Sequence, residues 1–413
     1  MTSATIADPA AVSVLFLTHA FPRWSGDAAG SFILRLARAL GDRGIRVTVL
    51  TPHAAGLAAR ERIDGIDVVR FRYAPASFET LAYTGTMAEQ VRSSWQARAA
   101  LVSLLGAGFG RALREQRRLR PALLHAHWWF PSGVLGAAMK RISPLPLVTT
   151  MHGSDVRLAR STKAARSTFR WVLGSSDAAT SVSQWLAEQA HGIAPAQRVP
   201  AVAPMPAATD IFAPGPGRER DRLLYVGRLN AQKGLELLLR ALAEMRHPVP
   251  LDVVGDGADA ESLRALAMSL GIAERVNWHG ALPQDHLVPF YRRTAALVVP
   301  SREEGLGLVA VEAQLCETPV VAFDSGGLRD IVEDQATGLL VKDFESRALA
   351  TAIDDLLEKP DRAIELGKAG RRAALRVFAP DAVAQSYASI YRDAITLHGA
   401  GRQPVVDPHP RHE

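Results

Sequence analysis

The chain has 413 residues, of which 48% are apolar, so it is too long for one hydrophobic core and fits two domains of ordinary size. Lys and Arg number 48 against 42 Asp and Glu, and this modest balance of +6 does not by itself indicate a polyanionic partner. The composition excludes a disordered chain, and the apolar stretch ALVSLLGAGFG is shorter than the roughly 20 residues that cross a bilayer.

Short β-branched runs alternate with helical patterns in the first half of the chain, which is typical of parallel sheets covered by crossover helices. The run VSVLFLTH predicts a buried strand, GSFILRLARALGDRG an amphipathic helix ending near Gly44, and VTVL a second strand. Further strands are expected in ALLHAHW, PLVTTMHG and AATSVS. We predict one doubly wound, Rossmann-like α/β domain over residues 1–203.

The alternation stops in the proline-rich segment VPAVAPMPAATDIFAPGPGRE, which reads as a linker, and then restarts. Strands are expected in RLLYVGRL, VPLDVVGDG, RVNWHG, AALVVPS and TPVVAFDS. They predict a second doubly wound domain over residues 204–380, a helix over 381–396, and a tail over 397–413 that we expect to be disordered. Two such domains face each other across a cleft at the carboxyl ends of their strands, where ligands of open α/β folds bind.

The segment SREEGLGLVAVEAQLC places two carboxylates, Glu304 and Glu312, in a strand-to-helix loop and in the second turn of the helix. The backbone amides of Gly307, Leu308 and Val309 lie at the positive helix end and favour a phosphate group. Carboxylates beside a phosphate are best explained as acceptors for sugar hydroxyls. The alternative is a solvated loop glutamate and a glutamate that favours the helix dipole.

The segment YVGRLNAQKGLELLLRAL sets Arg228 just after a strand and Lys233 where a new helix begins. Both cations are expected in the loop layer that holds Glu304, which suits a diphosphate that needs its charge neutralised. A lone cation at the end of a strand is more often an exposed surface charge. The occurrence of both cations together with the Glu304 loop favours a diphosphate site.

Histidines follow two strands of the first domain. His152 precedes Gly153 at the end of one strand, where it is either a ligand-binding or a merely hydrogen-bonded loop residue. For His125 and His127 in HAHWW we expect side chains on opposite faces of a strand, which favours a structural role over a shared metal ion. We therefore predict no metal site, and no DxD metal motif is visible.

Together, EGLGLVAVEA, VVPSREEG, TPVVAFDSGGLRDIVEDQATGLLV, VGRLNAQKG and HGSDV resemble the GT-B glycosyltransferases of family 4, the retaining nucleotide-sugar transferases. The resemblance covers nearly the whole chain. It implies that Arg228 and Lys233 hold the donor diphosphate, that Glu304 contacts the hexose, and that Glu312 contacts the ribose. It further implies that His152 lies near the donor sugar, that Gly30 approaches the phosphates, that the backbone at Leu282 meets the base, and that the last helix crosses back onto the first domain.

These observations predict a metal-independent, retaining transfer of a hexosyl unit from a UDP- or GDP-linked sugar to a glycan, lipid-linked or small-molecule hydroxyl. The donor is a co-substrate, and no cofactor is expected. His152 and Glu304 are the candidate catalytic residues. The alternatives are a GT-B relative that epimerises a nucleotide sugar or transfers it to phosphate, and a basic protein that binds anionic lipid or nucleic acid. The lack of interleaved aromatic residues argues against nucleic acid.

The positive charge is concentrated between Arg92 and Arg170, where fourteen Lys or Arg stand against Glu115 and Asp155. In VRLARSTKAARSTFRWVL the basic residues recur every three or four positions, along one face of a helix. This face and residues 111–120 are either solvated or attract an anionic membrane surface or a lipid-diphosphate acceptor. The single cysteine, Cys316, and the lack of a secretion signal predict a cytoplasmic setting, with peripheral contact at the inner face of the membrane.

Overall fold

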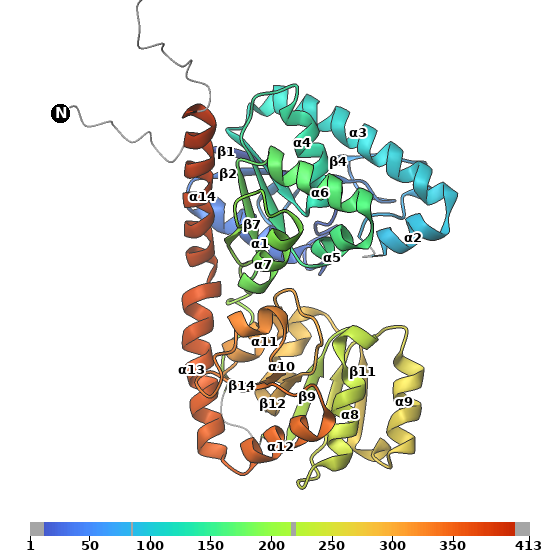
Figure 1. Ribbon diagram of the computed structural model, residues 1–413, viewed down its shortest axis with the longest axis vertical. Helices are drawn as coiled ribbons and strands as arrows, with labels where there is room; N and C mark the ends of the chain where they lie inside the picture. Colours follow the sequence, from blue (N-terminus) through green and yellow to red (C-terminus); the bar gives the residue numbers. More distant parts are fainter. Residues whose placement is uncertain (1–11, 84–85, 216–219, 401–413) are drawn as a thin grey trace, which may run out of the picture.

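The computed structural model describes residues 12–83, 86–215 and 220–400, which form two α/β domains stacked along the long axis of the molecule (Figure 1). The first domain contains β1 (Ser13–Leu17), β2 (Arg46–Pro52), β3 (Arg60–Ile63), β4 (Ile66–Phe71), β5 (Leu123–His127), β6 (Leu147–Met151), β7 (Ala178–Ser181) and β8 (Ala201–Val202). Its helices are α1 (Ser31–Asp42), α2 (Met87–Ser93), α3 (Trp95–Leu119), α4 (Val134–Lys140), α5 (Ser154–Ser161), α6 (Lys163–Ser175) and α7 (Gln184–Ile193).

The second domain repeats the same architecture on a smaller sheet. Its strands are β9 (Arg222–Val226), β10 (Leu251–Val254), β11 (Val276–Gly280), β12 (Thr294–Val299), β13 (Val320–Phe323) and β14 (Leu339–Val341). Its helices are α8 (Leu235–Glu244), α9 (Ala260–Ser269), α10 (Val288–Arg293), α11 (Leu308–Leu315), α12 (Ser346–Leu357) and α13 (Pro360–Phe378). The long helix α14 (Pro380–Ala400) follows.

The strand order of each sheet positions the loops that carry the candidate site residues. The first sheet runs β3-β4-β2-β1-β5-β6-β7-β8, and only the β3–β4 pair is antiparallel. The second runs β11-β10-β9-β12-β13-β14 and is parallel throughout. The order reverses between β1 and β5 and between β9 and β12, and ligands of doubly wound sheets bind beyond the carboxyl ends of strands at such points. The predicted fold of two facing Rossmann-like domains is confirmed.

The central strands are buried on both faces by helices, which explains why they read as continuous apolar runs. Every residue of β5, β6 and β12 is buried, including four polar side chains, His125, His127, Thr149 and Thr150, that are fully covered. The helices that cover them are amphipathic: α1 buries six of its apolar residues against the sheet.

Helix α14 crosses back from the second domain and packs along the first (Figure 1), as the family resemblance implies. The hydroxyl of Tyr391 lies 2.7 Å from Nδ1 of His125, and the hydroxyl of Tyr387 donates to the carbonyl of Ala203 at 3.1 Å. The helix runs to Ala400, beyond the predicted end at residue 396. The rest of the predicted tail, residues 401–413, lies outside the described residues.

The chain passes between the domains at two places that lie side by side. One is the segment after β8, and the other is the junction between α13 and α14. The backbone N–H of Ala207 in the first donates to the carbonyl of Phe378 in the second at 2.9 Å. This hydrogen bond joins the two crossings at one edge of the molecule.

The prediction that His125 and His127 point to opposite faces of a strand is wrong. Side chains two residues apart in a strand share a face, because successive Cβ atoms alternate. The two rings lie 4.1 Å apart between centroids, and both are buried in the first domain. Within the described ranges, no group of three or more His, Cys, Asp or Glu is arranged to hold a metal ion.

Candidate active site

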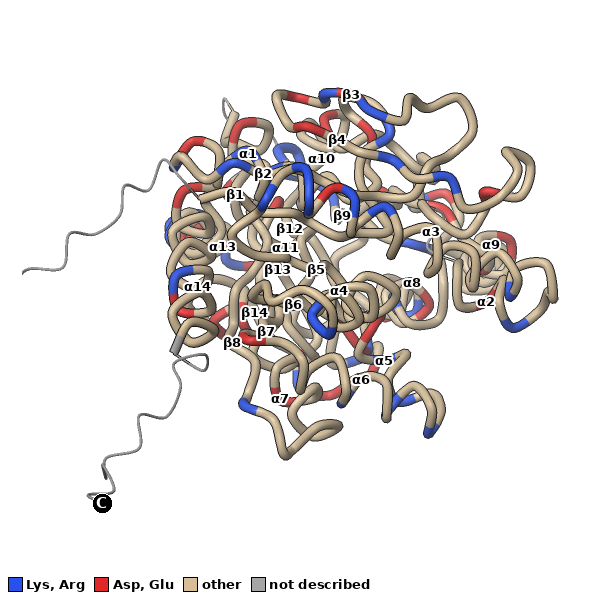
Figure 2. Tube along the Cα trace, turned by 90° about the horizontal axis from the view of Figure 1, so that it is seen from above, with Lys and Arg blue, Asp and Glu red and all other residues tan. Residues whose placement is uncertain are grey.

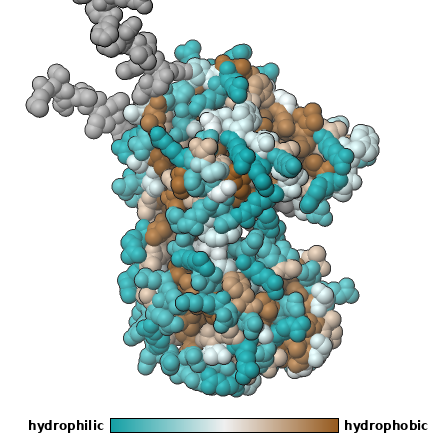
Figure 3. Space-filling model, viewed as in Figure 1, coloured by the Kyte–Doolittle hydropathy of each residue, from teal (hydrophilic) through white to brown (hydrophobic). Residues whose placement is uncertain are grey.

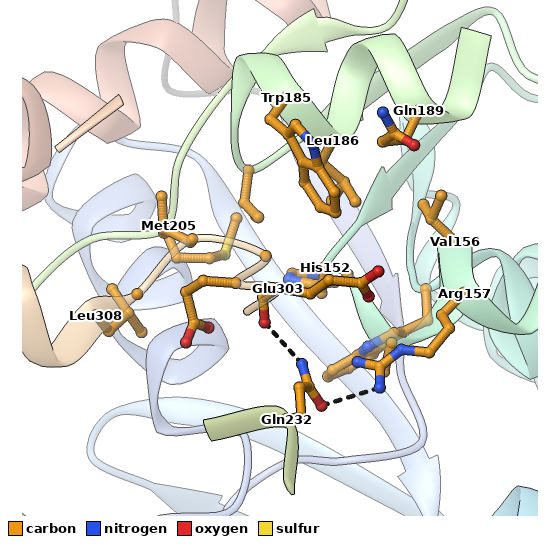
Figure 4. A pocket seen from close by; sticks show the side chains of 18 of the residues that line it. His152, Val156, Arg157, Trp185, Leu186, Gln189, Met205, Gln232, Glu303 and Leu308 are labelled. Atoms are coloured by element: carbon orange, nitrogen blue, oxygen red, sulfur yellow. Dashed lines mark hydrogen bonds between the residues drawn. The ribbon is translucent and has the colours of Figure 1, made fainter. Parts of the chain in front are cut away.

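A cavity of about 600 Å³ lies between the two domains, at the carboxyl ends of β5, β6, β9 and β12 (Figure 4). The surface is hollowed at this level, and hydrophilic side chains line the rim (Figure 3). The predicted residues that line the cavity are His152 from the first domain and Arg228, Lys233, Glu304, Gly307 and Leu308 from the second. The structure therefore brings most of the candidate site together from segments far apart in the sequence.

Lys233 and Glu304 form a direct ion pair. Lys233 ends the short 3₁₀ turn η4 (Ala231–Lys233), and its Nζ donates to Oε2 of Glu304 at 2.5 Å. Both side chains are largely covered, with 19% and 12% of their surface exposed. The ammonium and the carboxylate, which the sequence assigns to a diphosphate and to a sugar, are thus adjacent at the floor of the cleft.

The amino end of α11 presents unsatisfied backbone donors beside this ion pair. Gly307 precedes the helix with φ at 96°, in the left-handed region that favours glycine. A Cβ there would lie 2.9 Å from Leu328 and 3.1 Å from Glu304. Among the described residues no acceptor contacts the amides of Leu308 and Val309, so these two N–H groups and the helix dipole can receive an anion.

Arg228 and Gly30 occupy different environments. Arg228 follows β9, is exposed and lines the cavity, and its side chain makes no ion pair with the described residues. Gly30 precedes α1 with φ at 69°, and a Cβ there would lie 2.4 Å from the carbonyl oxygen of Ala20. Gly30 is therefore required by the packing of its own loop, whether or not it also approaches a phosphate.

Glu312 lies behind the cavity, in a polar network. Its Oε1 accepts a hydrogen bond from Gln284 at 2.5 Å and its Oε2 accepts one from Tyr291 at 2.8 Å. Burial raises the pKa of Glu312, although the hydrogen bonds from Gln284 and Tyr291 and the charge of Arg35 oppose the shift. Leu282, the predicted contact of the base, lies half-buried in the loop between β11 and Gln284.

His152 is held between aromatic rings at the roof of the cavity. Its ring centroid lies 4.4 Å from that of Trp128 and 5.3 Å from that of Phe32. Its Nε2 shares a 3.2 Å hydrogen bond with Nδ1 of His127. Burial lowers the pKa of His152 well below its usual range, and His127 and His19 lower it further. The ring is therefore neutral near pH 7 and acts as a hydrogen-bonding group.

Asp155 fixes the turn that carries His152. Its Oδ1 accepts from the backbone N–H groups of His152 at 3.1 Å, Gly153 at 2.9 Å and Val156 at 3.1 Å, and its Oδ2 accepts from that of Trp129 at 3.3 Å. Burial raises the pKa of Asp155 to about 6, even though these four hydrogen bonds favour the ionised form. Sequence reasoning missed this residue, although an Asp in the first turn of a helix is a recognisable capping signal.

The raised pKa of Asp155 predicts a pH-dependent difference in stability between the protein and its Asp155→Asn variant. A carboxyl with a higher pKa in the folded state binds more protons there, so its contribution to the free energy of unfolding falls as pH rises from about 4 to 6. The stability of the wild type relative to the variant should fall by roughly 2–3 kcal/mol across this window. Urea unfolding at pH 4, 5 and 6 measures the difference, and a pH-independent value would contradict the assignment.

Hydrogen bonds join the two domains around the cavity. The Ser183 hydroxyl donates to the carbonyl of Gly305 at 2.6 Å, and Nη1 of Arg157 donates to Oε1 of Gln232 at 2.9 Å. Nε2 of Gln232 in turn donates to the carbonyl of Glu303 at 2.8 Å (Figure 4). Arg35 of α1 also donates to Gln284 of the second domain, and Gln284 in turn donates to Glu312. None of these partners is visible in local sequence patterns.

Lys and Arg positions lie along α3 and along α5 and α6 of the first domain (Figure 2), and the ion pairing of these two basic segments differs. In α3 the buried carboxylate of Glu115 forms ion pairs with Arg60, Arg111 and Arg118, so much of the charge of that segment is neutralised internally. Along α5 and α6 the four arginines at 157, 160, 166 and 170 make no ion pair with the described residues. Only this second segment borders the cleft.

Both halves of the chain match models of glycosyltransferase families. Residues 29–203 match Glycosyltransferase Family 4, and residues 208–373 match Glycosyl transferases group 1. Among solved structures, the sucrose-phosphate synthase of Thermosynechococcus elongatus is 24% identical with a TM-score of 0.77, covering 93% of this chain and 99% of that one. Anabaena HepE in complex with UDP is 20% identical with a TM-score of 0.71, covering 92% and 100%. These structures share the fold.

Curated relatives extend the likeness over most of the chain. A D-inositol 3-phosphate glycosyltransferase of Acidothermus cellulolyticus is 32% identical over 412 residues, which is 90% of this chain and 87% of that protein. A GDP-mannose-dependent alpha-(1-6)-phosphatidylinositol monomannoside mannosyltransferase of Mycolicibacterium smegmatis is 34% identical over 273 residues, 60% of this chain and 71% of that protein. With matches across both domains, the chain belongs to the family 4 glycosyltransferases of GT-B fold.

Proposed function

We propose that the enzyme transfers a hexosyl unit from a UDP- or GDP-linked sugar to a hydroxyl acceptor, with retention of configuration and without a metal ion. The observation that carries the proposal is that Arg228, Lys233 and the amino end of α11, with its free amides, line the same cavity. Two cations and free amides on one cavity suit a diphosphate leaving group better than any other part of a nucleotide sugar. Relatives named for GDP-mannose and a fold neighbour solved with UDP support this donor class.

Charge stabilisation is the main task in such a transfer. When the bond between the anomeric carbon and the diphosphate oxygen breaks, the electron pair stays on the diphosphate. The cations Arg228 and Lys233, with the amides of Leu308 and Val309, stabilise this developing charge, as a metal ion does in other transferases. The acceptor hydroxyl then attacks from the face the leaving group has just left, and its proton passes to a diphosphate oxygen.

The remaining groups position the sugars. In the structure Glu304 accepts a hydrogen bond from the ammonium of Lys233 in the cleft. In the complex its carboxylate accepts hydrogen bonds from hexose hydroxyls, while Lys233 turns to the diphosphate. His152, neutral and fixed by Trp128 and His127, orients the reacting sugar from the opposite domain. We assign Glu312 to the ribose and the Leu282 backbone to the base.

The acceptor is expected to be a glycan or lipid-linked hydroxyl. None of the helices in the described part of the chain is long and apolar enough to cross a membrane. Contact with an anionic membrane surface would have to be peripheral and electrostatic, through the unpaired arginines of α5 and α6 rather than through α3, where Glu115 compensates the charge.

Nucleotide binding tests the proposal most directly. We expect one of UDP, GDP and ADP to raise the melting temperature of the protein at micromolar concentration, and EDTA to leave this shift unchanged. Hydrolysis of a panel of nucleotide sugars then identifies the hexose, and proton NMR of the first product formed reports its anomeric configuration. Indifference to all three nucleotides would overturn the donor assignment. Loss of activity with EDTA, restored by a divalent ion, would overturn metal independence.

A further inference from the structure

His127 is a buried histidine that reaches the site of transfer only through a second histidine, His152. Its side chain is fully covered, and its Nδ1 lies 3.2 Å from Nε2 of His152. The ring of His152 is half-buried and lines the cavity (Figure 4). Nδ1 of His152 has no hydrogen-bond partner among the described residues and is not enclosed by them. This nitrogen is therefore the one that the ring offers to a ligand in the cleft.

Only one of the two rings can donate the hydrogen bond that they share. Burial lowers the pKa of both His127 and His152 well below the usual range, so each ring is neutral near pH 7 and carries a single proton. In one arrangement Nδ1 of His127 donates, and His152 carries its proton on Nδ1. In the other Nε2 of His152 donates, and His127 carries its proton on its own Nε2. The two arrangements are distinguished by the surroundings of Nε2 of His127.

Nε2 of His127 is buried and has no hydrogen-bond partner among the described residues. The ring of His127 packs against those of Phe16 and His125, with centroids 4.8 Å and 4.1 Å away. Both nitrogens of His125 are already bonded, to the hydroxyls of Tyr391 and Thr150, and the ring of Phe16 is only a weak acceptor. A buried N–H without an acceptor is rarer in proteins than a buried acceptor without a donor. The surroundings therefore favour a lone pair, and not a proton, on Nε2 of His127.

We propose that His127 is a positioning residue, whose Nδ1–H donates to Nε2 of His152 and so sets the tautomer in which Nδ1 of His152 presents an N–H group to the sugar in the cleft. This inference rests on the proposed function, because it specifies what the ring of His152 offers to that substrate. The hydrogen bond at one ring nitrogen determines where a neutral imidazole carries its proton. A nitrogen that already carries a proton cannot accept another from the acceptor hydroxyl, so His152 binds a sugar oxygen and is not the general base of the transfer.

The tautomer can be measured without any substrate. In a long-range proton–nitrogen NMR spectrum of the protein with ¹⁵N-labelled histidine, the chemical shift separates the protonated from the unprotonated nitrogen of each neutral ring. We expect both His127 and His152 to carry the proton on Nδ1 at pH 7. The spectra of His127→Asn and His152→Gln identify the signals of the two rings. A proton on Nε2 of His152 in the wild type would overturn the proposal.

Two substitutions of His127 separate a hydrogen-bonding role from a packing role. Asparagine carries an amide N–H close to the place of the imidazole Nδ1–H, so His127→Asn should keep the tautomer of His152 and retain transfer within roughly threefold of the wild type. His127→Leu fills the site without a donor, so both tautomers of His152 should appear and kcat/KM should fall by roughly tenfold or more. Equal rates in these two variants would show that His127 acts through packing alone.

His53→Asn is the matched control, because His53 is also a buried histidine of the first domain but does not line the cavity. It should leave the tautomer of His152 and the rate of transfer unchanged, and urea unfolding of each variant shows how much stability is lost. Affinity for free UDP and GDP should equal that of the wild type in both His127 variants, because His152 is assigned to the sugar. Failure of the wild type to bind any nucleotide would overturn the proposed function. Nucleotide binding together with a proton on Nε2 of His152 would overturn the tautomer assignment alone.

Discussion

Replacing Lys233 with alanine is expected to lower the rate of sugar transfer by roughly 10- to 100-fold and to leave the protein folded, because a charged hydrogen bond to the departing diphosphate is lost. The ammonium is held at the floor of the cleft by Glu304, at 2.5 Å, so its position is set before the donor arrives. Removing it also leaves the Glu304 carboxylate without its partner, beside an incoming polyanion. Both effects reduce donor affinity and turnover together.

Steady-state kinetics on Lys233→Ala and Lys233→Arg, with circular dichroism to verify folding, provide the measurement. The arginine variant keeps the charge and should recover part of the activity. Lys342→Ala, at an exposed position after β14, is the matched control and should behave as the wild type does. Turnover of Lys233→Ala equal to that of the wild type would show that the cation does not contact the leaving group.

The two glutamates are expected to separate into different roles. Glu304→Ala should reduce transfer by roughly 10- to 100-fold and spare affinity for the free nucleotide, because its proposed partner is the hexose. Glu312→Ala should weaken the binding of both nucleotide sugar and free nucleotide. In the structure only Glu304 lines the cavity, whereas Glu312 lies behind it with Gln284 and Tyr291 as partners.

Calorimetry with the free nucleotide distinguishes the two roles, and Glu274→Ala on the exposed surface is the control. Because Glu312 is buried, its removal leaves the Tyr291 hydroxyl unpaired and lowers stability, so Glu312→Gln is measured alongside it. Equal losses of nucleotide affinity in the Glu304 and Glu312 variants would show that the roles assigned to the two carboxylates are wrong.

The sequence predicted the domains because parallel strands buried on both faces leave a strong signal. Continuous apolar runs such as those of β1 and β12 can only be satisfied between two layers of helices. The antiparallel hairpin of β3 and β4 was missed, although Asp64 and Gly65 form a turn of the kind that joins such strands. β3 has four residues and only one of them is buried, so its apolar pattern is weak.

Sequence patterns predicted only those residues of the candidate site that lie within local motifs. Arg228, Lys233 and Glu304 follow strands or begin helices, and such positions converge at the carboxyl edge of a parallel sheet. The contact of Arg35 with Gln284 joins residues 249 positions apart, and it depends on how the two domains dock. The pairing of Glu115 with three arginines likewise decides which basic segment stays charged. Helical spacing places Arg111 and Arg118 beside Glu115, but nothing in the sequence pattern reveals the contact with Arg60.

The hydrogen bond between Ala207 and Phe378 joins the two crossings of the chain at a single edge. Helices α13 and α14 run along the side of the molecule away from the notch (Figures 1 and 3). Two bodies joined along one edge can rotate about that edge as about a hinge, but they resist sliding past each other. The displacement grows with distance from the axis, so a small rotation separates Arg157 from Gln232 at the far rim while the packing of α14 barely changes. Rotation of the two domains therefore opens and closes the cleft mainly at the rim that lies far from the joined edge.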